Sequence, residues 1–155
     1  MQNRFNELVG ALAEQIGIKC DMNPGENIVT LSLEGFSVRI CLLEDMRAAV
    51  MQAVVGLVPE SDREPLYAEL LRLNSLFRGS KGAAFALEGD IVTLQSFLIL
   101  EGATEESFTA QAVCFLDALA SAIEGFDAVV ERAASGALPA PADEAVLDLL
   151  NMIRV

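Results

Sequence analysis

The first part of the chain switches between a helical and an extended apolar periodicity. Apolar residues recur at helical spacing from Phe5 to Ile16, which predicts a helix that a following glycine can end. Apolar and polar residues then alternate strictly over Val29–Leu33 and Phe36–Leu42, which predicts an antiparallel hairpin. A shorter alternation over Ile18–Met22 predicts one more short strand before it.

Residues 48–58 carry mixed signals. Ala48–Gln52 favours a helix, whereas the valines of Val54–Val58 favour a strand. Gly56 and the closing Pro59 argue against a long helix. We therefore predict a strand here.

The block from Ser61 to Leu100 predicts a leucine-rich helix, a glycine-rich turn and a second hairpin. Its helix is apolar on two sides. One stripe is enough to cover a sheet, and it consists of Leu66, Leu70, Leu73 and Phe77. The neighbouring stripe needs another partner, and it consists of Tyr67, Leu71 and Asn74. Because so small a domain rarely buries a helix all round, we favour a homodimer over deep burial within one subunit.

A long helix is predicted after Thr104, which suits its N-cap. Gly125 is expected to end or bend it, and Phe126, Val129 and Val130 indicate that helix resumes or continues toward Ala134. The proline-containing segment 135–142 is typical of a linker. The apolar residues after it fall on one helical face: Val146, Leu149, Leu150 and Ile153. We expect one domain at 1–134, followed by a linker and an amphipathic C-terminal helix at 135–155.

The order of these elements predicts an α+β fold. Helices and strands should follow one another as α-β-β-β-α-β-β-α, with an antiparallel β-sheet covered by helices. Such a sheet offers exposed edges to which an extended peptide can add as a further strand.

Composition and net charge limit the classes of partner that the chain can bind. The 155 residues are 53% hydrophobic, enough for a sizeable core, and carry a net charge of −13. That charge repels nucleic acid and anionic lipid, so we expect neither as a partner; it either attracts basic segments or keeps an apolar protein soluble. No apolar run is long enough for membrane insertion, and no signal peptide is visible, so we expect a cytoplasmic protein.

Catalytic chemistry is nearly absent from the sequence. The chain has no histidine, which removes the common catalytic triads and the commonest zinc ligand. The three cysteines, Cys20, Cys41 and Cys114, have no CxxC spacing and suit buried thiols. Acidic pairs stand at predicted turns and helix starts, and no phosphate loop occurs. We predict no enzyme, no catalytic residue, no metal and no cofactor.

The block opened by the leucine-rich helix carries a family resemblance. Its segment Leu70-Leu71-Arg72-Leu73-Asn74-Ser75-Leu76, followed by glycines and a hairpin, resembles the class I type III secretion chaperones (the Tir chaperone-like family). The resemblance covers residues 1–123. It implies a cytoplasmic homodimer that binds the extended N-terminal chaperone-binding segment of a secreted effector protein and keeps it soluble and secretion-competent without ATP.

The resemblance also implies two surfaces. Effector binding is expected at the first helix and the early strands, where core packing of the same residues is the alternative: Phe5, Leu8, Leu12, Ile16, Val29, Leu31, Phe36 and Val38. The dimer interface is expected at Val54, Val55, Leu70, Leu71, Asn74 and Phe77. The alternative function is a YbjN-like regulatory or adaptor domain of the same architecture that binds folded protein partners.

Overall fold

The computed structural model describes residues 1–18, 20, 27–61, 63–77 and 80–136. It confirms the predicted α-β-β-β-α-β-β-α order. In chain order the helices and strands are α1 (Gln2–Gln15), β1 (Ile28–Leu33), β2 (Phe36–Leu43), β3 (Ala48–Leu57), α2 (Arg63–Asn74), β4 (Ala84–Glu88), β5 (Ile91–Ile99) and α3 (Glu105–Ala134). The predicted tail helix lies outside the described residues, as does most of the predicted linker.

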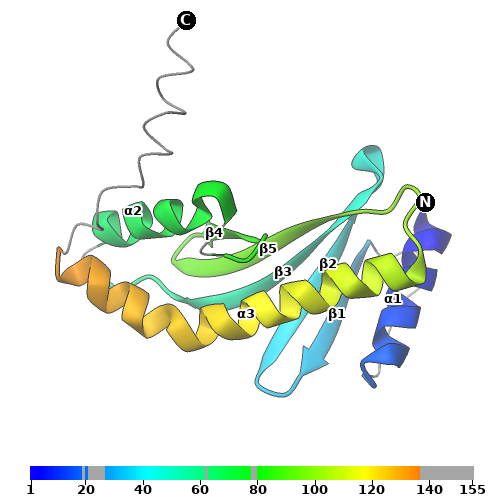
Figure 1. Cartoon of the computed structure of the whole chain (residues 1–155), viewed down its shortest axis with the longest axis horizontal. Helices are drawn as coiled ribbons and strands as arrows, with labels where there is room; N and C mark the ends of the chain where they lie inside the picture. Colours follow the sequence, from blue (N-terminus) through cyan, green and yellow to red (C-terminus); the bar gives the residue numbers. More distant parts are fainter. Residues whose placement is uncertain (19, 21–26, 62, 78–79, 137–155) are drawn as a thin grey trace, which may run out of the picture.

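One antiparallel sheet joins all five strands in the order β1-β2-β3-β5-β4. Figure 1 shows α3 running along the sheet, with α1 at one end and α2 at the other. The strand predicted at 48–58 is confirmed as β3, which pairs with β2 on one side and β5 on the other. Its valines and methionine therefore lie in the centre of the sheet, where β-branched side chains pack well.

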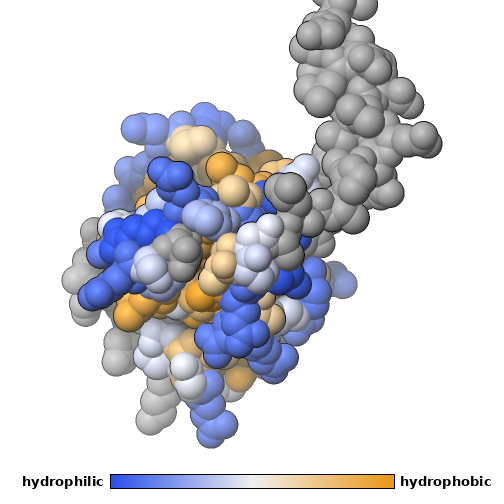
Figure 2. Space-filling model, turned by 90° about the vertical axis from the view of Figure 1, so that its left-hand side faces the viewer, coloured by the Kyte–Doolittle hydropathy of each residue, from blue (hydrophilic) through white to orange (hydrophobic). Residues whose placement is uncertain are grey.

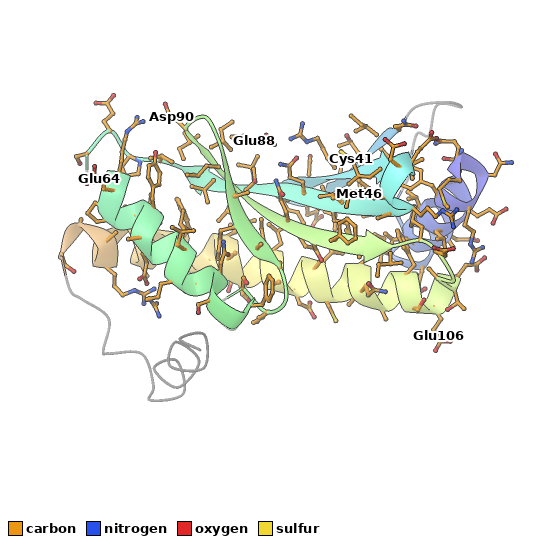
Figure 3. All side chains as sticks on the ribbon, turned by 90° about the horizontal axis from the view of Figure 1, so that it is seen from above. Cys41, Met46, Glu64, Glu88, Asp90 and Glu106 are labelled. Atoms are coloured by element: carbon orange, nitrogen blue, oxygen red, sulfur yellow. The ribbon has the colours of Figure 1, made fainter. Side chains whose placement is uncertain are left out.

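The helices cover only one face of the sheet. The inner face contributes the alternate residues of each strand, such as Leu31, Val38, Ile40, Met51 and Leu94, all without exposed surface. The helical stripes pack against them and are also fully buried: Phe5, Leu8 and Leu12 from α1, and Phe108 and Leu119 from α3. In Figure 3, α2 and α3 lie on one side of the sheet, and Cys41 and Glu88 lie on the other.

Helix α3 begins and ends where the sequence predicts. The Thr104 hydroxyl accepts a hydrogen bond from the Ser107 amide, and the Ser107 hydroxyl accepts one from the Thr104 amide, which closes a capping box. Of the expectations at Gly125, an end of the helix is wrong, and the continuation toward Ala134 is confirmed, because α3 runs without a break from Glu105 to Ala134. Phe126 and Val129 beyond the glycine are buried, and their packing holds the last turns in place.

Two local predictions differ from the structure. Ile18 and Cys20 are not in a strand, while Met22 lies outside the described residues. Gly17 does take the left-handed conformation, at φ 72°, and ends α1 as expected. Cys114 is exposed on α3 rather than buried, and Cys20 and Cys41 are half-buried. Burial raises the pKa of the Cys41 thiol above its ordinary value.

A glycine sets the packing of α3 on β3. The register between β3 and β5 shifts at Val54/Gly56, which marks a bulge. A Cβ atom built on Gly56 would lie 2.3 Å from the Phe126 ring, so only glycine leaves room for that ring.

An ionic cluster joins α2 to α3. Glu69 is buried and accepts two hydrogen bonds of 2.7 Å from Arg72, while Arg132 of α3 lies 3.4 Å away. The Arg72 guanidinium holds the pKa of the Glu69 carboxyl below its ordinary value, and Arg132 contributes to the same effect. A carboxyl whose pKa is lowered by folding stabilises the folded state whenever it is ionised.

We predict that Gly56→Ala destabilises the fold by about 1–3 kcal/mol, because the new methyl group displaces the Phe126 ring. Chemical denaturation measures this directly. In the background of Phe126→Leu, which shortens the ring to a branched chain, the cost of Gly56→Ala should fall by at least half. An equal cost in both backgrounds would contradict the assigned contact.

We predict that Glu69→Gln destabilises the chain at pH 7 by about 1–2 kcal/mol, since it removes one charged partner of two guanidinium groups. The contribution of Glu69 is present above the ordinary carboxyl pKa of 4.5 and disappears as pH falls through the lower folded-state value. The variant and the parent should therefore converge in stability as pH falls below that range. A difference that persists undiminished at pH 2 would argue against this cluster.

Candidate protein-binding surfaces

The free edge of the sheet lies at β1. The hairpin joining β1 and β2 turns at Glu34-Gly35, so Leu33 and Phe36 face each other across the turn as a hydrogen-bonded pair. Because hydrogen-bonded and non-hydrogen-bonded pairs alternate along an antiparallel ladder, the amides and carbonyls of Leu31 and Val29 also point toward β2. The hydrogen bond from the Leu42 amide to the Asn27 carbonyl agrees with this alternation, since Asn27 lies two residues before Val29.

The intervening residues of β1 therefore point their amides and carbonyls away from the sheet. These residues are Ile28, Thr30 and Ser32, and all three are exposed. Within the described part of the chain, no hydrogen bond occupies these outward groups. This row has the spacing that an added strand requires.

A hollow of about 560 Å³ lies beside the end of this edge. It is lined by the residues that directly follow α1, Ile16, Gly17 and Ile18, and by Ser32, Leu33 and Glu34 of the first hairpin. Ile16 and Leu33 are half-buried and pack against the core. An apolar side chain of a strand added along β1 would fit against them.

The opposite edge, at β4, is closed in its middle. Asn74 at the end of α2 donates its side-chain amide to the Phe85 carbonyl at 3.0 Å and accepts from the Phe85 amide at 2.7 Å. Both outward groups of Phe85 are therefore satisfied, as a further strand would otherwise satisfy them. The two edges differ: β1 is open and β4 is pinned to α2.

The structure places most of the predicted effector-binding residues in the core. Phe5, Leu8, Leu12, Val29, Leu31 and Val38 are buried, so in this conformation they shape the surface from beneath. Ile16 and Phe36 are half-buried and reach it. The sequence analysis did not identify the backbone amides and carbonyls of β1 that point away from the sheet. The two-residue hairpin turn at Glu34-Gly35 contained this information, because it fixes which residues of β1 bond to β2.

The predicted dimer residues divide between surface and interior. Leu71 and Phe77 are 70% and 54% exposed, and Val54 is also exposed. Leu70 and Val55 are buried, and Asn74 is occupied by its two hydrogen bonds to β4. The second apolar stripe predicted on α2 thus reduces to Leu71, because Tyr67 packs against the core.

Exposed apolar side chains gather around α2 and β4. Leu71, Phe77 and Leu87 are all exposed there, and Figure 2 shows apolar surface between polar side chains at this end of the molecule. A second apolar area lies on the uncovered face of the sheet, where Phe97 and Ile99 of β5 are exposed. These areas are the unpartnered apolar surfaces on which a second protein chain would gain most from burial.

The centre of the uncovered face is polar. Arg39 donates to Gln52 at 2.6 Å and to Glu88 at 3.2 Å, and Gln52 in turn donates to Glu88 at 2.5 Å. The network links β2, β3 and β4 across the sheet. It satisfies these groups internally, so it holds the sheet's outer face together rather than offering reactive side chains.

Other kinds of site find little support among the described residues. No group of three or more potential ligands is placed to hold a metal ion. Within the same ranges, no helix has the length and apolar character needed to cross a bilayer.

Three comparisons place the chain among known proteins. The model of the Tir chaperone protein (CesT) family matches residues 7–122. No curated protein matches the sequence. Among solved structures, the ExsC–ExsE complex contains a chain that is 19% identical with a TM-score of 0.65, covering 80% of this chain and 94% of that one.

Two further structures share the fold. The ExoU–SpcU complex from the type III secretion system of Pseudomonas aeruginosa gives a TM-score of 0.59 at 18% identity, covering 77% of this chain and 94% of that one. YbjN, a putative transcription regulator from E. coli, gives 0.58 at 16% identity, covering 78% and 90%. Structural likeness alone therefore does not distinguish the chaperones from YbjN, and the family match is what assigns the chain to a family. Since that match spans well over half of its residues, the chain belongs to the Tir chaperone protein (CesT) family, which confirms the predicted kinship with the class I type III secretion chaperones.

Proposed function

We propose that this chaperone binds the N-terminal segment of a secreted effector in extended form, by adding it as a strand along β1. The supporting observation is the row of outward backbone groups at Ile28, Thr30 and Ser32, next to the hollow at the end of α1. Several of the structurally similar chains were solved as chaperone–effector or related complexes. Binding keeps the effector soluble and competent for secretion.

Strand addition suits a chaperone that must accept an unfolded segment. Backbone hydrogen bonds contribute about 0.5–1.5 kcal/mol each and do not depend on the bound sequence. Apolar side chains of the segment then gain about 25 cal/mol per Å² where they cover Ile16 and Leu33. The backbone hydrogen bonds and the apolar contacts form without nucleotide, so binding proceeds without ATP. The bound effector is held in the cytoplasm before export.

The active form in this proposal is a homodimer that associates through α2 and β4. Leu71, Phe77 and Leu87 supply the apolar contact, and the Asn74 clamp fixes α2 on β4 so that they form one surface. This use of α2 leaves β1 of each subunit free for an effector segment.

The alternative is an adaptor that binds folded proteins. The likeness to YbjN favours it at the level of fold. Co-expression with the neighbouring open reading frames and affinity purification separates the two: an effector held through its N-terminal segment supports the chaperone, and folded partners that bind equally well without any such segment support the adaptor.

We predict that Thr30→Pro weakens binding of the recovered effector segment about tenfold, because it removes one outward amide while the ladder to β2 stays intact. Calorimetry without nucleotide measures the affinity. Thr30→Val is the matched control, since it changes the same side chain and keeps the amide. Circular dichroism verifies that both variants fold. Equal affinities for the two variants would refute strand addition at this edge.

We predict that Leu71→Asp converts the dimer to a monomer, since it puts a charge in the middle of the apolar contact. Light scattering coupled to gel filtration reports the mass. Ile28→Asp, at another exposed apolar position, is the control and should remain dimeric. A monomeric parent chain, or a Leu71→Asp variant that stays dimeric, would place the interface elsewhere.

A further inference from the structure

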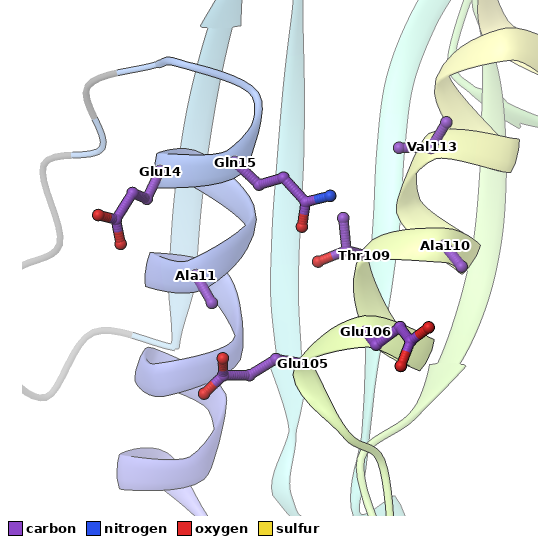
Figure 4. Close-up of a pocket in the computed structure, with 8 residues that line it drawn as sticks. All are labelled: Ala11, Glu14, Gln15, Glu105, Glu106, Thr109, Ala110 and Val113. Atoms are coloured by element: carbon purple, nitrogen blue, oxygen red, sulfur yellow. The ribbon is translucent and has the colours of Figure 1, made fainter.

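An acidic groove of about 670 Å³ runs between the end of α1 and the beginning of α3. Figure 4 shows that Gln15 of α1 and Glu105 and Thr109 of α3 point into the space between the two helices, while Glu14 and Glu106, which also line the groove, extend outward at its rims. Ala11 and Ala110 line it with small side chains, which keeps the space between the helices open. In the described part of the chain, no basic residue forms an ion pair with Glu14, Glu105 or Glu106.

The charges of α1 oppose its own dipole. A helix is stabilised by acidic residues in its first turn and basic residues in its last. Helix α1 has no acidic residue in the first turn and no basic residue in the last, where Glu14 lies instead. The negative end of α1 and the Glu14 carboxylate therefore add to one another beside the groove. An arrangement that lowers local stability without compensation is typical of a binding site.

Thr109 supplies a second and independent indication that the groove is a binding site. Its side chain is 3% exposed and its hydroxyl has no hydrogen-bond partner, the one such buried side-chain atom among the described residues. In Figure 4 the hydroxyl points toward α1, into the groove beneath the exposed side chain of Gln15. A buried hydroxyl without a partner costs about 1–3 kcal/mol, and a donor that enters when Gln15 swings aside would remove this cost.

We propose that the acidic groove binds an arginine or lysine side chain of the effector segment. The inference rests on the proposed function and names a specificity element for it. The groove adjoins the β1 site, because Gln15 lines the groove and the next residue, Ile16, lines the hollow beside β1. A guanidinium group has five donors, which suit the Glu105 carboxylate and the Thr109 hydroxyl together, while Glu14 and Glu106 add negative potential at the rims. The carboxylates do not converge closely enough to hold a metal ion.

The first test uses a small probe and the full chain. N-acetyl-arginine amide is titrated into isotope-labelled protein, with N-acetyl-citrulline amide as its neutral isostere. We expect amide shifts at Gln15, Thr109 and Ala110 with arginine alone, and they should weaken as salt is added. Shifts of equal size with citrulline, or shifts elsewhere on the surface, would overturn the assignment.

Two variants test the groove against the effector segment. Glu14→Gln/Glu105→Gln should weaken binding about tenfold, whereas Glu124→Gln/Glu131→Gln removes the same charge from exposed positions of α3 outside the groove and should have little effect. Thr109→Val should also weaken binding while leaving the folded state at least as stable, since the hydroxyl has no partner to lose. If Thr109 has a purely structural role, Thr109→Val should instead lower the stability of the fold and leave effector binding unchanged.

The outcomes separate the inference from the proposed function. If Thr30→Pro weakens effector binding and the groove variants do not, the strand site stands and the groove assignment fails. If no effector segment binds the parent chain, the proposed function fails, and the arginine titration still decides whether the groove selects cations.

Discussion

The one-sided burial of the sheet is the constraint on which the rest of this structure depends. Helices α1 and α3 cover the inner face, and fully buried residues from both helices and all three central strands form a single core. Because no described element covers the outer face or the outer side of β1, the same packing that stabilises the chain leaves backbone groups and apolar side chains to meet another protein. Stability and binding capacity thus come from one arrangement.

The two edges of the sheet show how this capacity is directed. An unpaired edge strand is a template for any extended chain, which is hazardous unless it is controlled. Asn74 closes the middle of β4 with two hydrogen bonds, and the same contact fixes α2 for its proposed role between subunits. At β1 the outward groups are left open, so an extended partner meets one accessible edge. Its end lies beside the apolar hollow at Ile16 and the acidic groove at Glu14.

Much of the architecture was predictable from residue spacing alone. The alternation around Glu34-Gly35 and the helical stripes of α1 and α3 fixed most elements, because each amphipathic face has one way to be buried. Residue preferences over 48–58 were divided between helix and strand. The structure confirms the strand, because its central place between β2 and β5 supplies backbone partners on both sides. The strand expected at Ile18 and Cys20 failed because alternation over so few residues occurs readily by chance.

The candidate sites were harder to predict, for a physical reason. Hydrophobic periodicity identifies which residues are buried, and so it pointed to Phe5, Leu8 and Leu31, which lie in the core. The proposed binding depends on outward backbone groups, which the sequence indicates only through the two-residue spacing of the hairpin turn, and on Thr109, whose lack of a partner appears only in three dimensions. Asn74 was recognised as significant, but its contact with the β4 backbone depends on a tertiary approach that spacing does not encode.

Hydrogen exchange of the backbone amides, with and without the bound effector segment, tests the central claim most directly. The outward amides of Ile28, Thr30 and Ser32 should exchange rapidly in the free chain and slowly in the complex, while the amide of Phe85, already bonded to Asn74, should change little. Protection confined to α2 and β4, with β1 unchanged, would contradict the account.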